Sequence, residues 1–270
     1  MIIDFHTHIF PDKISERTIS LLSESAGIPA YSDGTVDGLL KRMEEAGVDI
    51  SVTLPVLTSP KQFDSVNRFA AEINERFYGA SEKRLISFAG IHPDCDDIEG
   101  KMRFIKNTGF LGVKIHPDYQ GKFITDPGYV KIVKCAMEHG LIVVTHAGVD
   151  AGFRDAPVRC TPELALELVR TVPHKKLVFA HLGANEMTER TIDILAGEDV
   201  YFDTAYVLKH TDRDTFLRIL NKHGEDKLLF ATDSPWSDIA CDVQILKSYS
   251  LGRKTEDKIF FENAKELLGI

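Results

Sequence analysis

The chain has 270 residues, of which 43% are hydrophobic, and a formal net charge of −9 at pH 7. This composition excludes a disordered chain, and the length suits one α/β barrel. The acidic balance argues against nucleic acid or an anionic membrane surface as a partner. No apolar run reaches the roughly 18 residues that span a bilayer, and we expect no secretory leader before the first strand.

Short apolar segments alternate with amphipathic segments along the chain. The expected strands cover residues 2–8, 50–56, 85–93, 112–117, 141–146, 177–181, 200–204 and 228–233. The expected helices cover residues 14–26, 36–48, 62–78, 98–108, 129–139, 162–171, 187–195, 213–223, 239–249 and 256–268. Short strands that are apolar on both faces belong to a parallel sheet covered by helices. Eight strand–helix units therefore predict a single-domain TIM (β/α)8 barrel over residues 1–270.

An open, doubly wound sheet is the alternative fold, but no glycine-rich phosphate turn follows the first strand. The four cysteines are scattered without a C-x-x-C pair, at Cys95, Cys135, Cys160 and Cys241. Such spacing is typical of reduced thiols, not of a disulfide framework or a zinc finger. We therefore expect a cytoplasmic protein.

The first strand ends in a His-x-His pair. Side chains alternate along a strand, so His6 and His8 are expected on one face, roughly 6.5 Å apart. That spacing lets two imidazoles reach one ion, although a histidine near a strand end is more often structural. Polar residues also end later strands: His92, Lys114, His116, His146, His181 and Asp233. The carboxyl ends of barrel strands meet on one face, where active sites lie, so we expect these side chains to gather there.

Imidazole and carboxylate ligands suit a borderline divalent ion such as zinc. Three or four such ligands leave room for water, whereas structural zinc usually has a closed shell with cysteines. The pattern therefore predicts a catalytic site that holds Zn2+ or another divalent transition metal, as one or two ions.

Six stretches carry a family resemblance from end to end of the chain. They are DFHTH at residues 4–8, GVKIHP at 112–117, THAG at 145–148, AHLG at 180–183, ATDSPW at 231–236 and ENAKELLG at 262–269. In this order they resemble the amidohydrolase superfamily, and within it the amidohydrolase-related branch that includes aminocarboxymuconate semialdehyde decarboxylase. The resemblance implies a TIM barrel with metal-dependent chemistry.

The resemblance also implies roles for single residues. The implied metal ligands are His6, His8, His146 and Asp233. Asp233 would also act as the general base that accepts a proton from the attacking water. His181 would bind a second metal or orient that water.

Lys114 determines the expected number of ions. In binuclear members of the superfamily, a lysine at the end of strand four is carboxylated and bridges two ions, and the GVKIHP context is similar. The alternative is a plain ammonium that binds substrate or pairs with Asp233, and the sequence leaves both open. His116 shares the strand face of Lys114, so either side chain is expected to reach the site.

Five side chains are candidate substrate contacts: His92, His116, Arg154, Arg159 and Trp236. His92 either contacts the substrate or fixes its own loop, and Trp236 either walls the pocket or only packs. The two arginines lie on the long connection over residues 148–161. A guanidinium there suits a carboxylate or phosphate group, although pairing with Asp150 or Asp155 explains it equally well. We therefore expect a small, anionic substrate.

The favoured function is hydrolysis of a small amide, ester or lactone by a metal-activated water. A non-oxidative decarboxylase with the same ligands is the alternative. A deoxyribonuclease barrel would explain GIHP at residues 90–93, but it would require an acidic ligand in place of Lys114. A barrel that only binds or stores metal would lack a ligand, and none is missing. The expected partner is a small molecule; the sequence leaves a homo-oligomer open.

Overall fold

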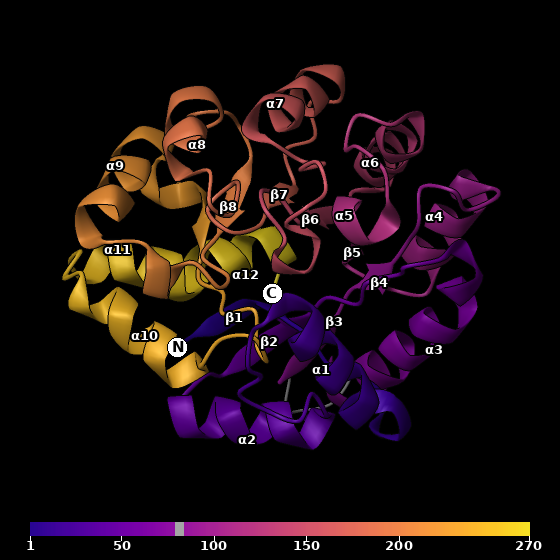
Figure 1. Ribbon diagram of the computed structural model, residues 1–270, viewed down its shortest axis with the longest axis horizontal. Helices are drawn as coiled ribbons and strands as arrows, with labels where there is room; N and C mark the ends of the chain where they lie inside the picture. The colour runs from indigo at the N-terminus through magenta and orange to yellow at the C-terminus, as the bar shows by residue number, and fades with distance from the viewer. Residues whose placement is uncertain (79–83) are drawn as a thin grey trace.

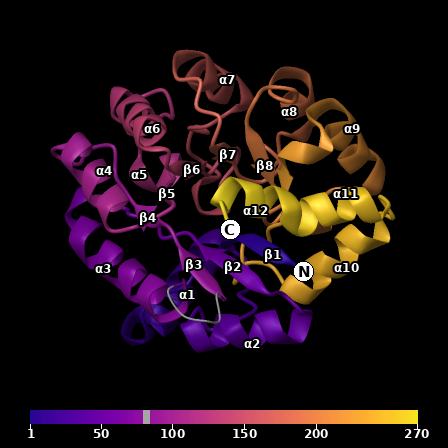
Figure 2. The ribbon, with the colours of Figure 1, turned by 180° about the vertical axis from the view of Figure 1, so that it is seen from behind.

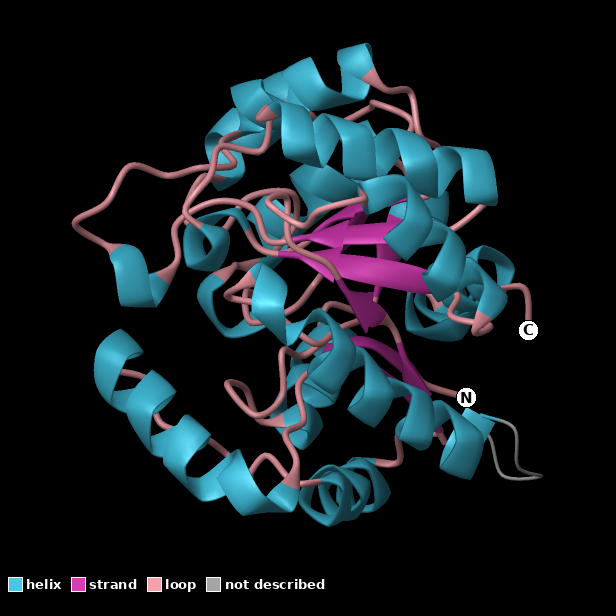
Figure 3. Ribbon diagram, turned by 90° about the vertical axis from the view of Figure 1, so that its right-hand side faces the viewer, coloured by secondary structure: helices cyan, strands magenta, loops and turns pink. Residues whose placement is uncertain are grey.

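The computed structural model describes residues 1–78 and 84–270, in which parallel strands alternate with helices (Figure 1). The strands are β1 Ile3–Thr7, β2 Ile50–Thr53, β3 Leu85–Ser87, β4 Ala89–Gly90, β5 Gly112–Ile115, β6 Ile142–Thr145, β7 Leu177–Phe179, β8 Tyr201–Asp203 and β9 Leu228–Leu229. They lie at the centre, surrounded by helices, and both termini lie at the same end of the molecule (Figure 3).

The strands form two parallel sheets, in the orders β1-β2-β3 and β4-β5-β6-β7-β8-β9. Phe88 alone separates β3 from β4, and its amide donates to the carbonyl of Thr53 at 3.0 Å. At the other edge, the amide of Phe5 in β1 donates to the carbonyl of Phe230, directly after β9, at 2.9 Å. β3 and β4 thus occupy one predicted strand, and the predicted α/β barrel is confirmed.

The helices are α1 Asp12–Ala26, α2 Val36–Ala46, α3 Phe63–Ile73, α4 Ile98–Asn107, α5 Pro117–Gln120, α6 Pro127–His139, α7 Pro162–Thr171, α8 Thr188–Ile194, α9 Arg213–His223, α10 Ile239–Ser248, α11 Arg253–Asp257 and α12 Asn263–Leu268. Short helical turns are η1 Pro60–Gln62, η2 Asn74–Tyr78, η3 Ala151–Phe153, η4 Leu208–His210, η5 Glu225–Lys227 and η6 Lys258–Glu262. Within the described ranges, no helix is long and apolar enough to cross a membrane.

Local signals explain where most helices begin and end. The Thr161 side chain accepts from the amide of Leu164 at the start of α7, with Pro162 in the first turn. Gly140 ends α6 in the left-handed conformation that glycine adopts without strain. The sequence did not predict α5, because a helix of four residues is too short for a periodic pattern.

Two hydrophobic clusters hold the barrel together. The larger lies between the strands and the surrounding helices. The smaller joins strand side chains to α12, which crosses the barrel in Figure 2. In this smaller cluster Phe5 and Phe88 are fully buried, and their ring centroids lie 6.0 Å apart in an edge-to-face arrangement. Such a contact stabilises beyond the area it buries.

Phe88→Ala is expected to lower the free energy of unfolding by about 3–5 kcal/mol, because it leaves a cavity beside Phe5 and the β3–β4 junction. Phe104→Ala is the matched control, since that ring is 53% exposed and its loss is expected to cost little. Urea unfolding followed by circular dichroism measures both. Equal losses in the two variants would contradict this role of Phe88.

Candidate active site

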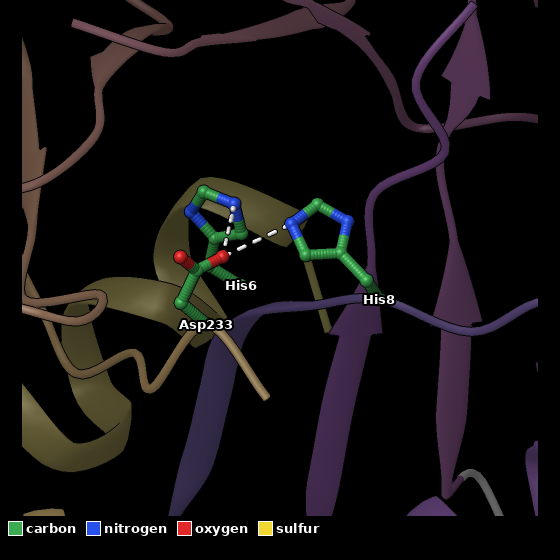
Figure 4. A group of neighbouring side chains, drawn as sticks. All are labelled: His6, His8 and Asp233. Carbon is green, nitrogen blue, oxygen red and sulfur yellow. Dashed lines mark hydrogen bonds and ion pairs between the residues drawn. The ribbon is translucent and has the colours of Figure 1, made fainter. Parts of the chain in front are cut away.

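Three side chains meet where β1 and β9 end (Figure 4). His6 lies in β1, His8 directly follows β1, and Asp233 follows β9. The Nε2 atoms of His8 and His6 lie 3.0 Å and 3.4 Å from Oδ1 of Asp233. One carboxylate oxygen therefore faces two imidazole nitrogens.

The backbone around this group is irregular. The pairing of β1 with β2 shifts between Asp4 and Thr7, so strict alternation does not position the two histidines. Asp233 has a positive φ of 67°, a conformation that aspartate tolerates better than most residues. Its amide donates to the carbonyl of His6 at 2.8 Å, and buried Asp4 accepts from the amides of His6 and Thr232. These hydrogen bonds connect the carboxyl end of β1 to the segment that follows β9.

Hydrogen-bond partners assign the tautomers of both histidines. Nδ1 of His6 lies 2.9 Å from Oδ2 of Asp203, and Nδ1 of His8 lies 2.8 Å from the carbonyl oxygen of Leu54. Both partners accept only, so each Nδ1 carries the proton, and each Nε2 presents a lone pair to Asp233. Nε2 of His6 also accepts from Nζ of Lys114 at 2.9 Å, whereas the lone pair of His8 faces the carboxylate oxygen of Asp233, an arrangement that a cation would stabilise. The donor set fits a divalent ion of the zinc type.

Asp233 faces this group as an ionised carboxylate. Burial raises its pKa, but when the His6 and His8 rings carry a proton their positive charge outweighs burial and holds the pKa below its ordinary value. A bound cation would act in the same direction. An ionised carboxylate can bind a cation or accept a proton.

Asp203, at the end of β8, orients side chains of the site through buried hydrogen bonds. It is fully buried, and one carboxylate oxygen accepts from Nδ1 of His6. The other oxygen accepts from the amides of His181 and Ala205, at 2.8 and 3.1 Å. Asp203 therefore fixes both the ring of His6 and the turn after β7.

His146 and His181 form a second, linked pair. Nδ1 of His181 donates to the carbonyl of Ala205 at 2.9 Å, so its Nε2 accepts from Nδ1 of His146, also at 2.9 Å. Nε2 of His146 is then a buried lone pair with no hydrogen-bond partner among the described residues. It lies 3.8 Å from Oδ2 of Asp118.

The structure groups His146 with His116 and Asp150. The rings of His116 and His146 stack with centroids 4.3 Å apart, and Nε2 of His116 lies 3.4 Å from Oδ2 of Asp150. Three of the four predicted metal ligands thus converge on one point, whereas His146 joins this neighbouring group. Asp150 was not predicted as a site residue; its only signal is its place two residues after the THAG motif.

Lys114 reaches the site from β5. Its side chain is 1% exposed, and its Nζ lies 2.9 Å from Nε2 of His6. Burial lowers the pKa of Lys114 to about 8, although nearby carboxylates of Asp203 and Asp233 oppose this. At pH 7 most Lys114 side chains are therefore ammonium groups.

A cavity of about 470 Å³ opens onto these groups. Its polar end includes His116, His181, Asp233 and Trp236, as the sequence predicted for this face of the barrel. Tyr206 also lines it and had not been predicted; no local pattern marks it.

The other three predicted substrate contacts do not line the cavity. Nδ1 of His92 accepts from the amide of Asp94 at 3.1 Å, which fixes its loop. Arg154 is 58% exposed and pairs with Glu186 at 2.8 Å, and Arg159 lies 3.4 Å from Oδ1 of Asp118. We therefore do not assign these residues to substrate binding.

The fold and the site define a metal-binding type of α/β-barrel enzyme, and comparison with known proteins names the family. The family model described as Amidohydrolase matches residues 3–270, so the chain belongs to the amidohydrolase family. The resemblance seen in the sequence motifs is confirmed. A search of curated proteins found no match.

Solved structures share the fold at low sequence identity. A TIM-barrel protein from Bordetella bronchiseptica has a TM-score of 0.74 and 14% identity, covering 99% of this chain and 98% of its own. A manganese complex of 5-carboxyvanillate decarboxylase from Novosphingobium aromaticivorans has a TM-score of 0.73 and 14% identity, covering 100% and 96%. A probable 2-pyrone-4,6-dicarboxylic acid hydrolase from Acinetobacter baumannii has a TM-score of 0.70 and 15% identity, covering 100% and 99%.

Asp203→Ala is expected to weaken binding of a divalent ion about 10- to 100-fold, because His6 loses the carboxylate that fixes its tautomer and ring orientation. Competition with a chromogenic chelator measures the dissociation constant for zinc. Asp199→Ala is the control, since that carboxylate is 55% exposed and pairs with Lys227 at the surface. Unchanged affinity in a folded Asp203→Ala protein would show that Asp203 only supports the fold.

Proposed function

We propose that this chain is a metal-dependent hydrolase that cleaves a small amide, ester or lactone with water. One observation carries the proposal: an ionised Asp233 and the lone pairs of His6 and His8 converge at the floor of a cavity large enough for a small molecule. This arrangement offers both a cation site and a base beside it.

His6, His8 and Asp233 would hold the ion, which we take to be zinc or another divalent transition metal. When bound, such an ion polarises a carbonyl group and lowers the pKa of water. The manganese bound in the structurally similar decarboxylase supports a divalent metal. We keep His146 as the proposed further ligand. Lys114 would bind a second ion only in the carboxylated form, and as an ammonium group it would contact the substrate instead.

The remaining chemistry belongs to the side chains of the chain. Asp233 accepts a proton from the attacking water and returns it to the leaving group. His181 lines the same cavity, but its two ring nitrogens are engaged by the Ala205 carbonyl and by Nδ1 of His146, so we propose that it acts by orienting the His146 ring. Lys114 is the only lysine or arginine among the described residues that line the cavity, so we propose a substrate with at most one anionic group.

Decarboxylation remains a second candidate, because the same cavity could bind a single carboxylate against Lys114. The structural likeness to 5-carboxyvanillate decarboxylase supports it. Hydrolysis is favoured because Asp233 is ionised and able to accept a proton, which decarboxylation does not require.

A screen of esters, lactones, amides and aromatic carboxylates on zinc- or manganese-loaded protein tests the proposal. We expect release of an acid and an alcohol or amine without carbon dioxide. Asp233→Asn is expected to lower kcat about 100-fold or more, because a general base contributes that much. His181→Ala is also expected to lower kcat, because His146 then loses the hydrogen bond that orients its ring. Asp193→Asn, a change at the surface helix α8, is the control.

Release of carbon dioxide in an amount equal to the product would contradict hydrolysis and support decarboxylation. Full turnover in Asp233→Asn protein with normal metal content would exclude Asp233 as the base.

A further inference from the structure

Helix α1 presents an evenly spaced stripe to the active-site cavity. Ile14, Thr18, Leu22 and Ala26 recur every four residues and all line the cavity. Residues four apart lie on one face of a helix, so this face of α1 forms a continuous wall. In Figure 1, α1 lies in front of β2 and β3, and its contacts include the η3 turn.

Helix α3 and its neighbours supply another part of the cavity wall. Val66 and Phe69 are one helical turn apart and line the same cavity, together with Leu54 and Val56 beyond β2. The cavity therefore runs from the polar group at Asp233 to a space between α1 and α3.

The apolar stripe of α1 is not part of the protein core. Neither Ile14 nor Leu22 belongs to the two hydrophobic clusters of the described residues. Ser15 is the one buried residue of α1. An amphipathic surface helix normally packs its apolar face on the core, whereas here that face borders the cavity. The stripe is therefore free to contact a bound molecule.

Charge is confined to one end of the cavity. Its charged lining residues, within the part of the chain that the structure describes, are Lys114, Asp150 and Asp233, all near the candidate metal ligands. The walls from α1 and α3 offer only neutral side chains, such as Thr18 and Ser65. This asymmetry fixes the orientation of an amphipathic ligand.

We propose that the substrate is an amphipathic small molecule with an uncharged apolar arm that lies between α1 and α3. Its polar, reacting group lies at Asp233; that part rests on the proposed function, whereas the arm rests on the two helix walls. The size of the cavity suits a small molecule and excludes a folded partner.

Calorimetric titration with butanoate, hexanoate and octanoate tests the arm on zinc-loaded protein. We expect affinity to rise about threefold to fourfold for each added methylene, the increment typical of transfer from water to an apolar site. Affinity that does not change with chain length would overturn the proposal.

Two variants locate the arm, and one matched control lies on the same helix. Leu22→Asp places a charge in the wall and is expected to abolish the rise with chain length. Ala26→Trp fills the space and is expected to weaken octanoate more than butanoate. Leu21→Asp is the control, because Leu21 is 55% exposed and lies outside the cavity lining. Equal effects of Leu21→Asp and Leu22→Asp, or a normal chain-length series in Ala26→Trp, would overturn the proposal.

The experiments distinguish failure of the apolar-arm proposal from failure of the hydrolase proposal. Affinity that does not change with chain length, together with Asp233-dependent hydrolysis of short esters, would overturn the apolar-arm proposal alone. Affinity that rises with chain length, without hydrolysis of any ester, lactone or amide, would overturn the hydrolase proposal alone.

Discussion

The candidate active site depends on three electron-pair donors that lie close together. His6 and His8 direct lone pairs at the carboxylate oxygen of Asp233, at 3.4 and 3.0 Å. In the absence of a bound ion, the ammonium of Lys114, 2.9 Å from Nε2 of His6, offsets only part of the repulsion between these like partial charges. A cation among them turns the same arrangement into a strong site. The rest of the molecule can be understood as the framework that keeps the three donors together.

The framework consists of buried hydrogen bonds behind each donor. Asp203 holds the far nitrogen of His6, the carbonyl of Leu54 holds that of His8, and the His6 carbonyl accepts from the amide of Asp233. These partners come from three different strand ends, so the site exists only when the barrel is assembled. Binding of an ion would therefore also stabilise the folded chain.

The sequence predicted the fold and the proximity of His6, His8 and Asp233 because their signals are local. Apolar strands and amphipathic helices have distinct periods, and the carboxyl ends of barrel strands share one face. His6, His8 and Asp233 could be placed near one another from these rules alone. The position of His146 could not, because its ring orientation depends on His181 and on partners far along the chain.

The sequence did not predict the walls that α1 and α3 supply to the cavity for a related reason. The sequence left Arg154 open between an anion contact and pairing with Asp150 or Asp155, yet it pairs with Glu186, which is 32 residues away in sequence. The sequence predicted a helix at residues 14–26, but not that one of its faces borders the cavity. Periodicity shows that a helix face is apolar, but only the assembled barrel shows what that face contacts.

Metal content tests the central claim most directly. Purified protein is stripped with a chelator, incubated with zinc or manganese, freed of unbound ion and analysed by mass spectrometry. The account predicts at least one divalent ion per chain, and a loss of that ion when His6 and His8 are both changed to alanine in a protein that still folds. Less than half an equivalent in the unchanged protein after reconstitution, or full occupancy in the double variant, would contradict it.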